Sequence, residues 1–145
     1  MGDQAKKFLN DTLSVKRAAI SPMSFTKPYW EATREKKLVI QFCPETKRYQ
    51  FYPRPMSIFT GKRNLEWREV PGNGIVFSYT ITRRALPPFR GHEPFALAMV
   101  ELDEGVRIMG DLIHVAEDDI KIGMKVKPFW IPLPDGYNLL AFTPR

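Results

Sequence analysis

Four residues between positions 43 and 60 have a spacing that could bind a metal ion. Two residues lie between Cys43 and Thr46, and Ser57 and Thr60 repeat that spacing after ten intervening residues. Structural zinc ribbons place two C-x-x-C turns at such a separation, because two thiolates from each turn complete a tetrahedron around the ion. Three of the four positions carry hydroxyls here, and neutral hydroxyls do not replace thiolates as zinc ligands. We predict a ribbon without zinc, the alternative being a chance spacing around one small buried cysteine.

The residues able to catalyse acid–base chemistry are few. His92 and His114 are the only two histidines, and neither belongs to a recognisable triad. Asp111 and His114 are three apart on an expected strand, so their side chains point to opposite faces. The chain contains no Walker loop, dinucleotide-binding glycine motif or H-E-x-x-H motif. We therefore expect no catalytic residue, and surface or edge positions for both histidines.

Two helices and a ribbon are expected in the first half of the chain. Apolar residues between positions 3 and 13 are spaced roughly as on a helix. Residues 28–37 form a better helix, because proline favours the first turn and basic residues end the segment. Tyr29, Trp30 and Thr33 would form its packing side. Residues 38–42 read as a strand, followed by a turn-rich segment.

The second half reads as a barrel of five strands. The expected strands are 75–82, 95–102, 106–115, 124–131 and 138–143. In the first of these, Ile75, Phe77, Tyr79 and Ile81 alternate with smaller or hydroxylated residues, which predicts that they face the core. Gly110 would mark a bulge or a sharp coil of the wall. The fold is thus expected to be mainly β, with a helical segment at 1–37, a degenerate zinc ribbon at 38–72 and a five-stranded OB-fold barrel at 73–145.

Charge and composition restrict the classes of partner. The net charge is +6, but residues 1–72 hold 14 Lys and Arg against 7 Asp and Glu, whereas residues 73–145 hold 8 against 9. The expected barrel is therefore nearly neutral and lacks an electrostatic funnel for a polyanion. No apolar stretch approaches the roughly 18 residues of a membrane helix. A single cysteine and no signal-peptide core predict a protein of the reducing cytoplasm.

An ordered series of short strings carries a family resemblance over about residues 28–130. The strings are Pro28–Ala32, Gln41–Cys43, Phe51–Pro55, Leu65–Trp67, Gly74–Tyr79, Val100–Gly105 and Ile122–Met124. Together they resemble a family of unknown-function, acyl-CoA-associated domains in which a helix and a rubredoxin-like zinc ribbon precede an OB-fold. The family's four ribbon cysteines would fall on Cys43, Thr46, Ser57 and Thr60, so this chain departs from the pattern at three of them.

The resemblance implies a non-catalytic accessory subunit that completes the acyl-CoA site of a thiolase-like, condensing or aldolase enzyme. No tightly bound cofactor is then expected, only a CoA thioester shared with that partner. Arg83, Arg84 and Arg90 could meet CoA phosphates, because the planar guanidinium donates two hydrogen bonds at once, and Phe89 offers apolar surface beside them. The alternative for these arginines is a solvated strand end. The alternative function is a single-stranded nucleic-acid-binding OB module with Phe77, Tyr79 and Phe95 as stacking platforms.

Overall fold

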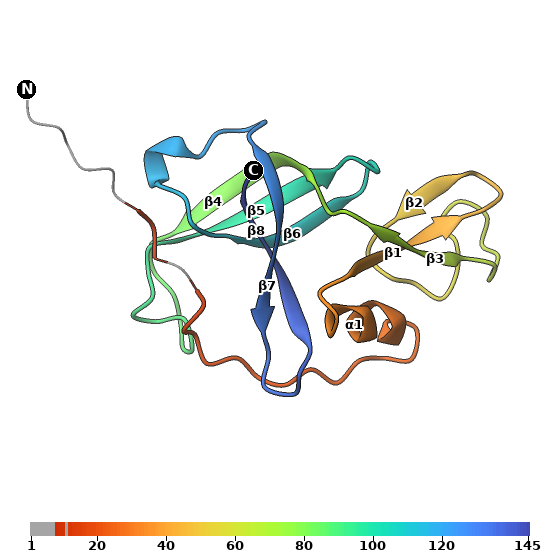
Figure 1. Ribbon diagram of the computed structural model, residues 1–145, viewed down its shortest axis with the longest axis horizontal. Helices are drawn as coiled ribbons and strands as arrows, with labels where there is room; N and C mark the ends of the chain where they lie inside the picture. Colours follow the sequence, from red (N-terminus) through yellow and green to blue (C-terminus); the bar gives the residue numbers. More distant parts are fainter. Residues whose placement is uncertain (1–7, 11) are drawn as a thin grey trace, which may run out of the picture.

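The computed structural model describes residues 8–10 and 12–145 (Figure 1). One short helix and eight strands follow one another along this part of the chain. Three strands form a small sheet and five form a closed barrel, which confirms the expected mainly β fold. Within the described residues no helix is long and apolar enough to cross a membrane.

The first module consists of helix α1 (Lys27–Thr33) and an antiparallel sheet of β1 (Leu38–Cys43), β2 (Arg48–Gln50) and β3 (Glu66–Val70) in the order β2-β1-β3. Alternate residues of the central strand β1 serve two different contacts. Leu38 and Ile40 join the large apolar cluster that fills the barrel. Gln41 and Cys43 hydrogen-bond to the loop that follows β2. Strand β1 therefore connects this first module, called the ribbon module below, to the barrel core.

The barrel contains β4 (Gly74–Thr82), β5 (Phe95–Leu102), β6 (Arg107–Leu112), β7 (Lys125–Pro132) and β8 (Asn138–Pro144). The strands close in the order β4-β5-β6-β8-β7, with β7 pairing back to β4. All pairs are antiparallel except β6 and β8, which share one registered parallel pair, Leu112 with Phe142. A five-stranded closed barrel with a parallel contact between its third and fifth strands is an OB-fold. The short helical turn η1 (Glu117–Asp119) connects β6 to β7.

Strand β4 differs from the sequence prediction in the face that it buries. Val76 is completely buried, whereas Ile75, Phe77 and Tyr79 are 39, 41 and 40% exposed. A register shift between Val76 and Ser78 in the pairing with β5 interrupts the strict alternation. Simple alternation of apolar and hydroxylated residues does not detect such a bulge. The prediction that Phe77 and Tyr79 face the core was therefore wrong.

Gly110 does not mark a bulge, because its strand pairs with β5 in unbroken register from Ala96–Leu112 to Glu101–Arg107. A Cβ atom at this position would lie 3.1 Å from the Leu140 carbonyl oxygen and 3.1 Å from the Phe142 ring. The glycine instead allows β8 to approach β6 closely. The residue was correctly singled out, but the bulge that we expected there is absent.

Both expected helices need correction. Residues 3–7 and 11 of the first lie outside the described residues; in the remainder, Phe8 forms a β-bridge with Ala116, and the Asn10 amide donates to the Pro94 carbonyl. These backbone groups bond to the barrel, so the helix is absent at residues 8–10. The second helix is α1, which ends at Thr33 instead of 37. Lys36 adopts a left-handed conformation (φ 57°), which stops the helix.

Candidate functional site

An apolar cleft lies between the first module and the barrel. It has a volume of about 290 Å³, at the lower end of the range for small-molecule sites. Its walls come from α1, the loop after β2, and strands β6 and β8: Thr26, Tyr29, Trp30, Phe51, Tyr52, Pro53, Ile108, Met109, Leu139 and Leu140. Almost all of the lining is carbon, so the cleft suits an apolar chain or side chain.

Helix α1 supplies the aromatic wall of this cleft. Pro28 stands at the start of the helix, where its missing N–H costs no hydrogen bond. Tyr29 is buried and joins the barrel's apolar cluster, while Trp30 packs edge-on against it with ring centroids 5.1 Å apart. Burial raises the pKa of the Tyr29 phenol well above its usual range, so the group is neutral at physiological pH. The wall is therefore apolar and uncharged.

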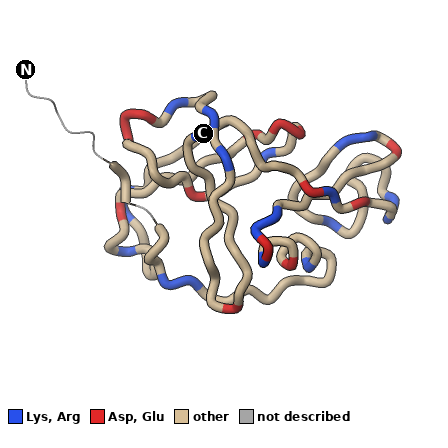
Figure 2. The backbone as a smooth tube through the Cα atoms, in the orientation of Figure 1, with Lys and Arg blue, Asp and Glu red and all other residues tan. Residues whose placement is uncertain are grey.

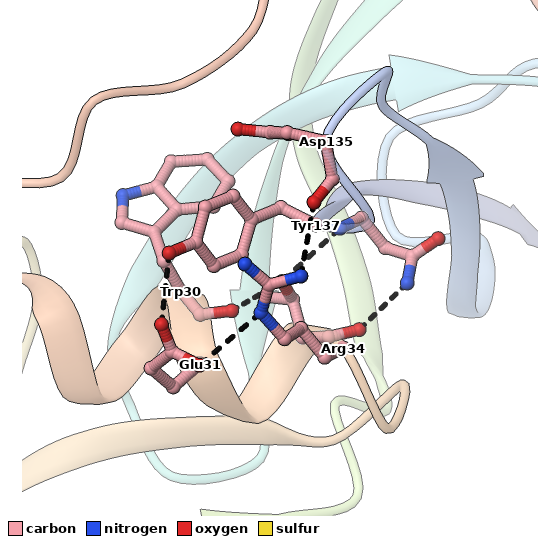
Figure 3. A network of polar contacts seen from close by, with 7 residues as sticks. Trp30, Glu31, Arg34, Asp135 and Tyr137 are labelled. Carbon is pink, nitrogen blue, oxygen red and sulfur yellow. Dashed lines mark hydrogen bonds and ion pairs between the residues drawn. The ribbon is translucent and has the colours of Figure 1, made fainter.

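A polar network fixes α1 against the hairpin between β7 and β8 (Figure 3). Arg34 donates from Nη1 to the Asp135 carbonyl at 2.9 Å and from Nε to Glu31 at 3.2 Å. The Tyr137 hydroxyl donates to Glu31 Oε1 at 2.8 Å, and the Arg34 guanidinium lies 3.9 Å from the centre of the Tyr137 ring. The hydrogen bond from Tyr137 is the main cause that lowers the pKa of Glu31 below its usual range.

A second, buried pair of bonds completes the attachment of α1. Asn138 donates from its backbone amide to Thr33 Oγ1 at 3.1 Å and from Nδ2 to the Thr33 carbonyl at 2.7 Å. The helix C-terminus thereby satisfies carbonyl and hydroxyl groups that would otherwise be buried without partners. Because α1 is held at its end, the positions of Tyr29 and Trp30 in the cleft are fixed.

The four ribbon positions form a hydrogen-bonded pair of turns. Ser57 Oγ lies 3.2 Å from Cys43 Sγ and donates to it, while accepting the backbone amides of Phe59 and Thr60 at 3.2 and 3.3 Å. Hydrogen bonds from Ser57 and then Thr46 lower the pKa of the Cys43 thiol to about 7. One thiol with three hydroxyls does not make a zinc donor set. Among the described residues no three His, Cys, Asp or Glu side chains come together as a metal site.

Two buried glutamines brace the ribbon beside this turn pair. Gln50 Nε2 donates to Gln41 Oε1 at 2.9 Å and to the Met56 carbonyl at 3.2 Å, and its Oε1 accepts the Ile58 amide at 2.9 Å. Gln41 in turn donates to the Arg54 carbonyl at 2.7 Å and accepts the Arg54 amide at 2.8 Å. These bonds hold the loop that carries Phe51, Tyr52 and Pro53 into the cleft. Sequence reasoning missed the brace, because isolated glutamines carry no pattern.

The arginines proposed from sequence for CoA phosphates lie in another part of the molecule. The loop after β4 that holds them is at the opposite end of the barrel from α1 and the ribbon (Figure 1). Arg83 forms an ion pair with Glu117. Phe89 packs against Phe95 with centroids 5.5 Å apart and lies under the Arg17 guanidinium. None of Arg83, Arg84, Phe89 and Arg90 lines the apolar cleft, and their contact with CoA remains a prediction.

The other polar residues singled out for catalysis also have structural partners. Asp111 accepts hydrogen bonds from Thr12 and from Arg17, the latter at 2.8 Å. His114 lies beyond the end of β6 in a left-handed conformation, so the expected strand 106–115 ends early and the opposite-face argument does not apply to it. Its ring contacts Phe129 edge-on at 5.2 Å. The described residues therefore place no nucleophile and base beside the apolar cleft.

The apolar cleft itself was not predicted. Tyr29, Trp30 and Phe51 were expected to pack, but their convergence with β6 and β8 depends on how the two modules meet. The only available signal was the number of aromatic residues around the ribbon, and that does not give a position. A site formed between modules has no local sequence pattern.

A helix, a three-stranded ribbon and an OB barrel that together enclose an apolar cleft define a class of two-module β proteins. The family model for the ChsH2 C-terminal OB-fold domain matches residues 67–130 of the sequence. A DUF35 domain-containing scaffold protein of Pyrococcus furiosus is 35% identical over 106 residues, which cover 73% of this chain and 77% of that protein. The chain belongs to the DUF35 family.

Two further relatives extend this comparison. A probable enoyl-CoA hydratase alpha subunit of Thermomonospora curvata is 34% identical over 117 residues, which cover 80% of this chain but only 36% of that longer protein. A solved chain of the Ltp2-ChsH2(DUF35) aldolase has a TM-score of 0.76 at 32% identity, covering 88% of this chain and 98% of that one. The resemblance to acyl-CoA-associated OB-fold domains is thereby confirmed, and the zinc ribbon of that family is not shown for this chain.

Proposed function

We propose that this chain is a non-catalytic subunit of an acyl-CoA-processing enzyme, to which it contributes one wall of the acyl-CoA site. The observation that carries the proposal is the apolar cleft, which both modules build and whose described lining contains no His, Cys, Asp, Glu or Lys side chain. Such a cleft can receive and orient an apolar chain but supplies no proton transfer. The chemistry must then come from the partner enzyme.

The names of the relatives support this proposal. Similar chains occur in a hydratase alpha subunit, in an aldolase with two named components, and in scaffold proteins. The first two names refer to enzyme assemblies, and the third names a non-catalytic role. The common element is a chain named as a subunit, a component or a scaffold, and two of the three names refer to enzymes. A thiolase-like, condensing or aldolase enzyme is the partner class that we propose here.

Co-expression with adjacent genes tests the proposal directly. We expect the full chain to elute together with an enzyme subunit and to show no turnover of acyl-CoA by itself. The chain eluting alone, with full enzyme activity in a separate fraction, would contradict the proposed role.

A cleft variant then tests the site within that complex. Met109 lines the cleft and is 56% exposed, so Met109→Asp places a charge there without opening the core. We expect the KM for acyl-CoA to rise about tenfold or more, because the apolar chain would have to desolvate a carboxylate. Ile122→Asp is the matched control, since Ile122 is an exposed apolar side chain outside the cleft. Equal effects of both substitutions would argue against the cleft as the acyl site.

A single-stranded nucleic-acid module is the second candidate, and one observation favours it. Phe77 and Tyr79 are exposed on β4, as stacking residues must be, and the Arg107 guanidinium lies 3.6 Å from the centre of the Phe77 ring. However, Lys and Arg are scattered along the chain and interspersed with Asp and Glu (Figure 2). Titration with an oligonucleotide at rising salt decides this, because true binding must weaken steeply.

A further inference from the structure

A second cleft lies beside the apolar one and has a different chemical character. It is formed between strand β2 and the hairpin of β5 and β6, which approach each other at the ribbon end of the barrel (Figure 1). Its volume is about 340 Å³, and the lining residues are Arg48, Tyr49, Gln50, Phe51, Ile58, Phe59, Glu101, Gly105, Val106 and Arg107. Phe51 lines both clefts, so the two clefts adjoin at this side chain.

Arg48 places a positive charge in this polar cleft. Its guanidinium lies 4.1 Å from the centre of the Phe59 ring, which holds the side chain flat. Among the described residues no carboxylate lies within ion-pair distance of Arg48. A stacked guanidinium keeps its edge N–H groups available, and these groups fit phosphate oxygens.

Arg107 faces the same cleft from the barrel. It is held over the Phe77 ring at 3.6 Å, and it forms an ion pair with Glu101 Oε1 at 3.6 Å, which is longer than a charge-assisted hydrogen bond. Glu101 is also the only carboxylate in the lining, so the cleft has an excess of one positive charge. Two arginines on facing modules with one opposing acid favour an anionic ligand.

Strand β6 passes from one cleft to the other in three consecutive residues. Arg107 lines the polar cleft, and Ile108 and Met109 line the apolar cleft. A ligand with an anionic head and an apolar tail could therefore cross Phe51 and occupy both. Acyl-CoA has this form, because its phosphorylated adenosine lies at the end of the molecule opposite the acyl group.

We propose that the polar cleft binds the phosphorylated nucleotide end of the acyl-CoA whose acyl arm enters the apolar cleft. The inference rests on the proposed function and adds to it a nucleotide-binding position on this chain. Arg48 and Arg107 bind the phosphates, while the rings of Phe59 and Phe77 keep the two guanidinium groups in place. This position differs from the loop of Arg83, Arg84 and Arg90 considered from the sequence.

The test uses the isolated full chain and adenosine 3′,5′-bisphosphate as the probe. Calorimetry at low salt should show saturable binding that weakens as salt rises, and the Arg48 and Arg107 Nε–H signals should shift in NMR spectra. Arg48→Met and Arg107→Met each keep an unbranched stem over the ring and remove the charge. Each should weaken binding about tenfold, as expected for one lost hydrogen bond to a charged group.

A control arginine outside both clefts and the arginines considered from the sequence make the test specific. Arg68 also stacks on a ring, 3.5 Å from the centre of Phe42, but it lines neither cleft, so Arg68→Met should not change binding. The double variant Arg83→Met/Arg84→Met should also bind normally. Loss of binding in the double variant, with Arg48→Met unaffected, would overturn the assignment.

Two outcomes separate this inference from the proposed function. No binding of the nucleotide probe, while the chain still co-elutes with its enzyme, refutes the nucleotide position and leaves the subunit role standing. Loss of co-elution in Arg48→Met, again without nucleotide binding, shows that the cleft receives an acidic segment of the partner and also refutes the inference. Met109→Asp should weaken binding of octanoyl-CoA but not of adenosine 3′,5′-bisphosphate.

Discussion

The ribbon module and the barrel hold their shapes by different means. The barrel closes around completely buried apolar side chains, among them Val76, Val100, Val126 and Phe142. The ribbon has a sheet of three strands, and the side chains buried on the loop side of β1 include Gln41, Gln50 and Ser57. Hydrocarbon burial stabilises the first, whereas a small set of directed hydrogen bonds positions the second.

This difference indicates how the ribbon module can keep its fold although three of its four metal-ligand positions carry hydroxyls. Small modules bury too little apolar surface to be stable alone and usually need a metal or disulfide. Here the glutamine brace and the Ser57 turn connect the loop to β1, and Leu38, Ile40 and Val70 join the barrel's apolar cluster. The ribbon is thus stabilised by its attachment to the barrel. Four experiments test this contrast between the two regions.

The largest effect is expected from restoring the metal ligands. Thr46→Cys/Ser57→Cys/Thr60→Cys would give four thiols at the ribbon positions together with Cys43. Structural zinc binding in small peptides has an apparent free energy of about 10–16 kcal/mol, so the triple variant should take up one zinc ion and its ribbon should be stabilised. Elemental analysis and thermal unfolding with and without a chelator measure this.

The unchanged chain serves as the control for that experiment. We expect less than stoichiometric zinc in it and no change in Tm when a chelator is added. One full equivalent of zinc in the unchanged chain would show that the hydroxyl turn pair is not metal-free.

The second effect concerns the barrel core. Phe142→Ala removes a completely buried ring and should lower the free energy of unfolding by about 3–5 kcal/mol, because it leaves a cavity. Urea unfolding measures the change. Phe77→Ala, on the exposed side of β4, is the control and should have a much smaller effect. Similar losses for both would mean that the bulge in β4 is misplaced.

The third effect is confined to the ribbon. Gln50→Leu keeps the approximate volume but removes the partners of the Met56 carbonyl and the Ile58 amide. Each buried group left without a partner costs about 1–3 kcal/mol. Amide hydrogen exchange should therefore accelerate in residues 54–58 while barrel amides remain protected. Asn64→Leu, which alters an exposed amide, should leave both regions unchanged; uniform acceleration in the Gln50 variant would contradict separate stabilisation.

The smallest effect is expected at the junction of the two regions. Tyr137→Phe keeps the ring beside Arg34 but removes the hydrogen bond to Glu31, so the pKa of Glu31 should rise toward its ordinary value. A depressed carboxyl pKa stabilises the folded state above the unfolded pKa, and this contribution is lost as pH falls through the folded pKa. The variant should therefore show a weaker dependence of stability on pH in the acidic range. Carboxyl NMR titration of Glu31 checks the shift, and an unchanged pKa would rule out the role of Tyr137.

The strands were largely predictable from the sequence, because local patterns determine them. Alternation and turn residues located all five barrel strands, and the tight turn at Gly105 follows from its left-handed conformation (φ 87°). The side that each strand buries was less predictable, since β4 buries Val76 and exposes Ile75 and Phe77. The clefts depend on residues distant in sequence, such as Tyr29 and Leu140, which only the packing of two modules brings together.

The apolar cleft is bounded on one side by a helix of seven residues that is not part of the barrel. The helix is attached to the hairpin of β7 and β8 through Arg34 and Thr33, so sheet pairing does not determine the wall that Tyr29 and Trp30 form. Exchanging Trp30 for a smaller residue would deepen the cleft without changing any barrel strand, whereas Tyr29 belongs to the barrel's apolar cluster. Selectivity for ligand length can therefore evolve, or be engineered, independently of the scaffold that carries it.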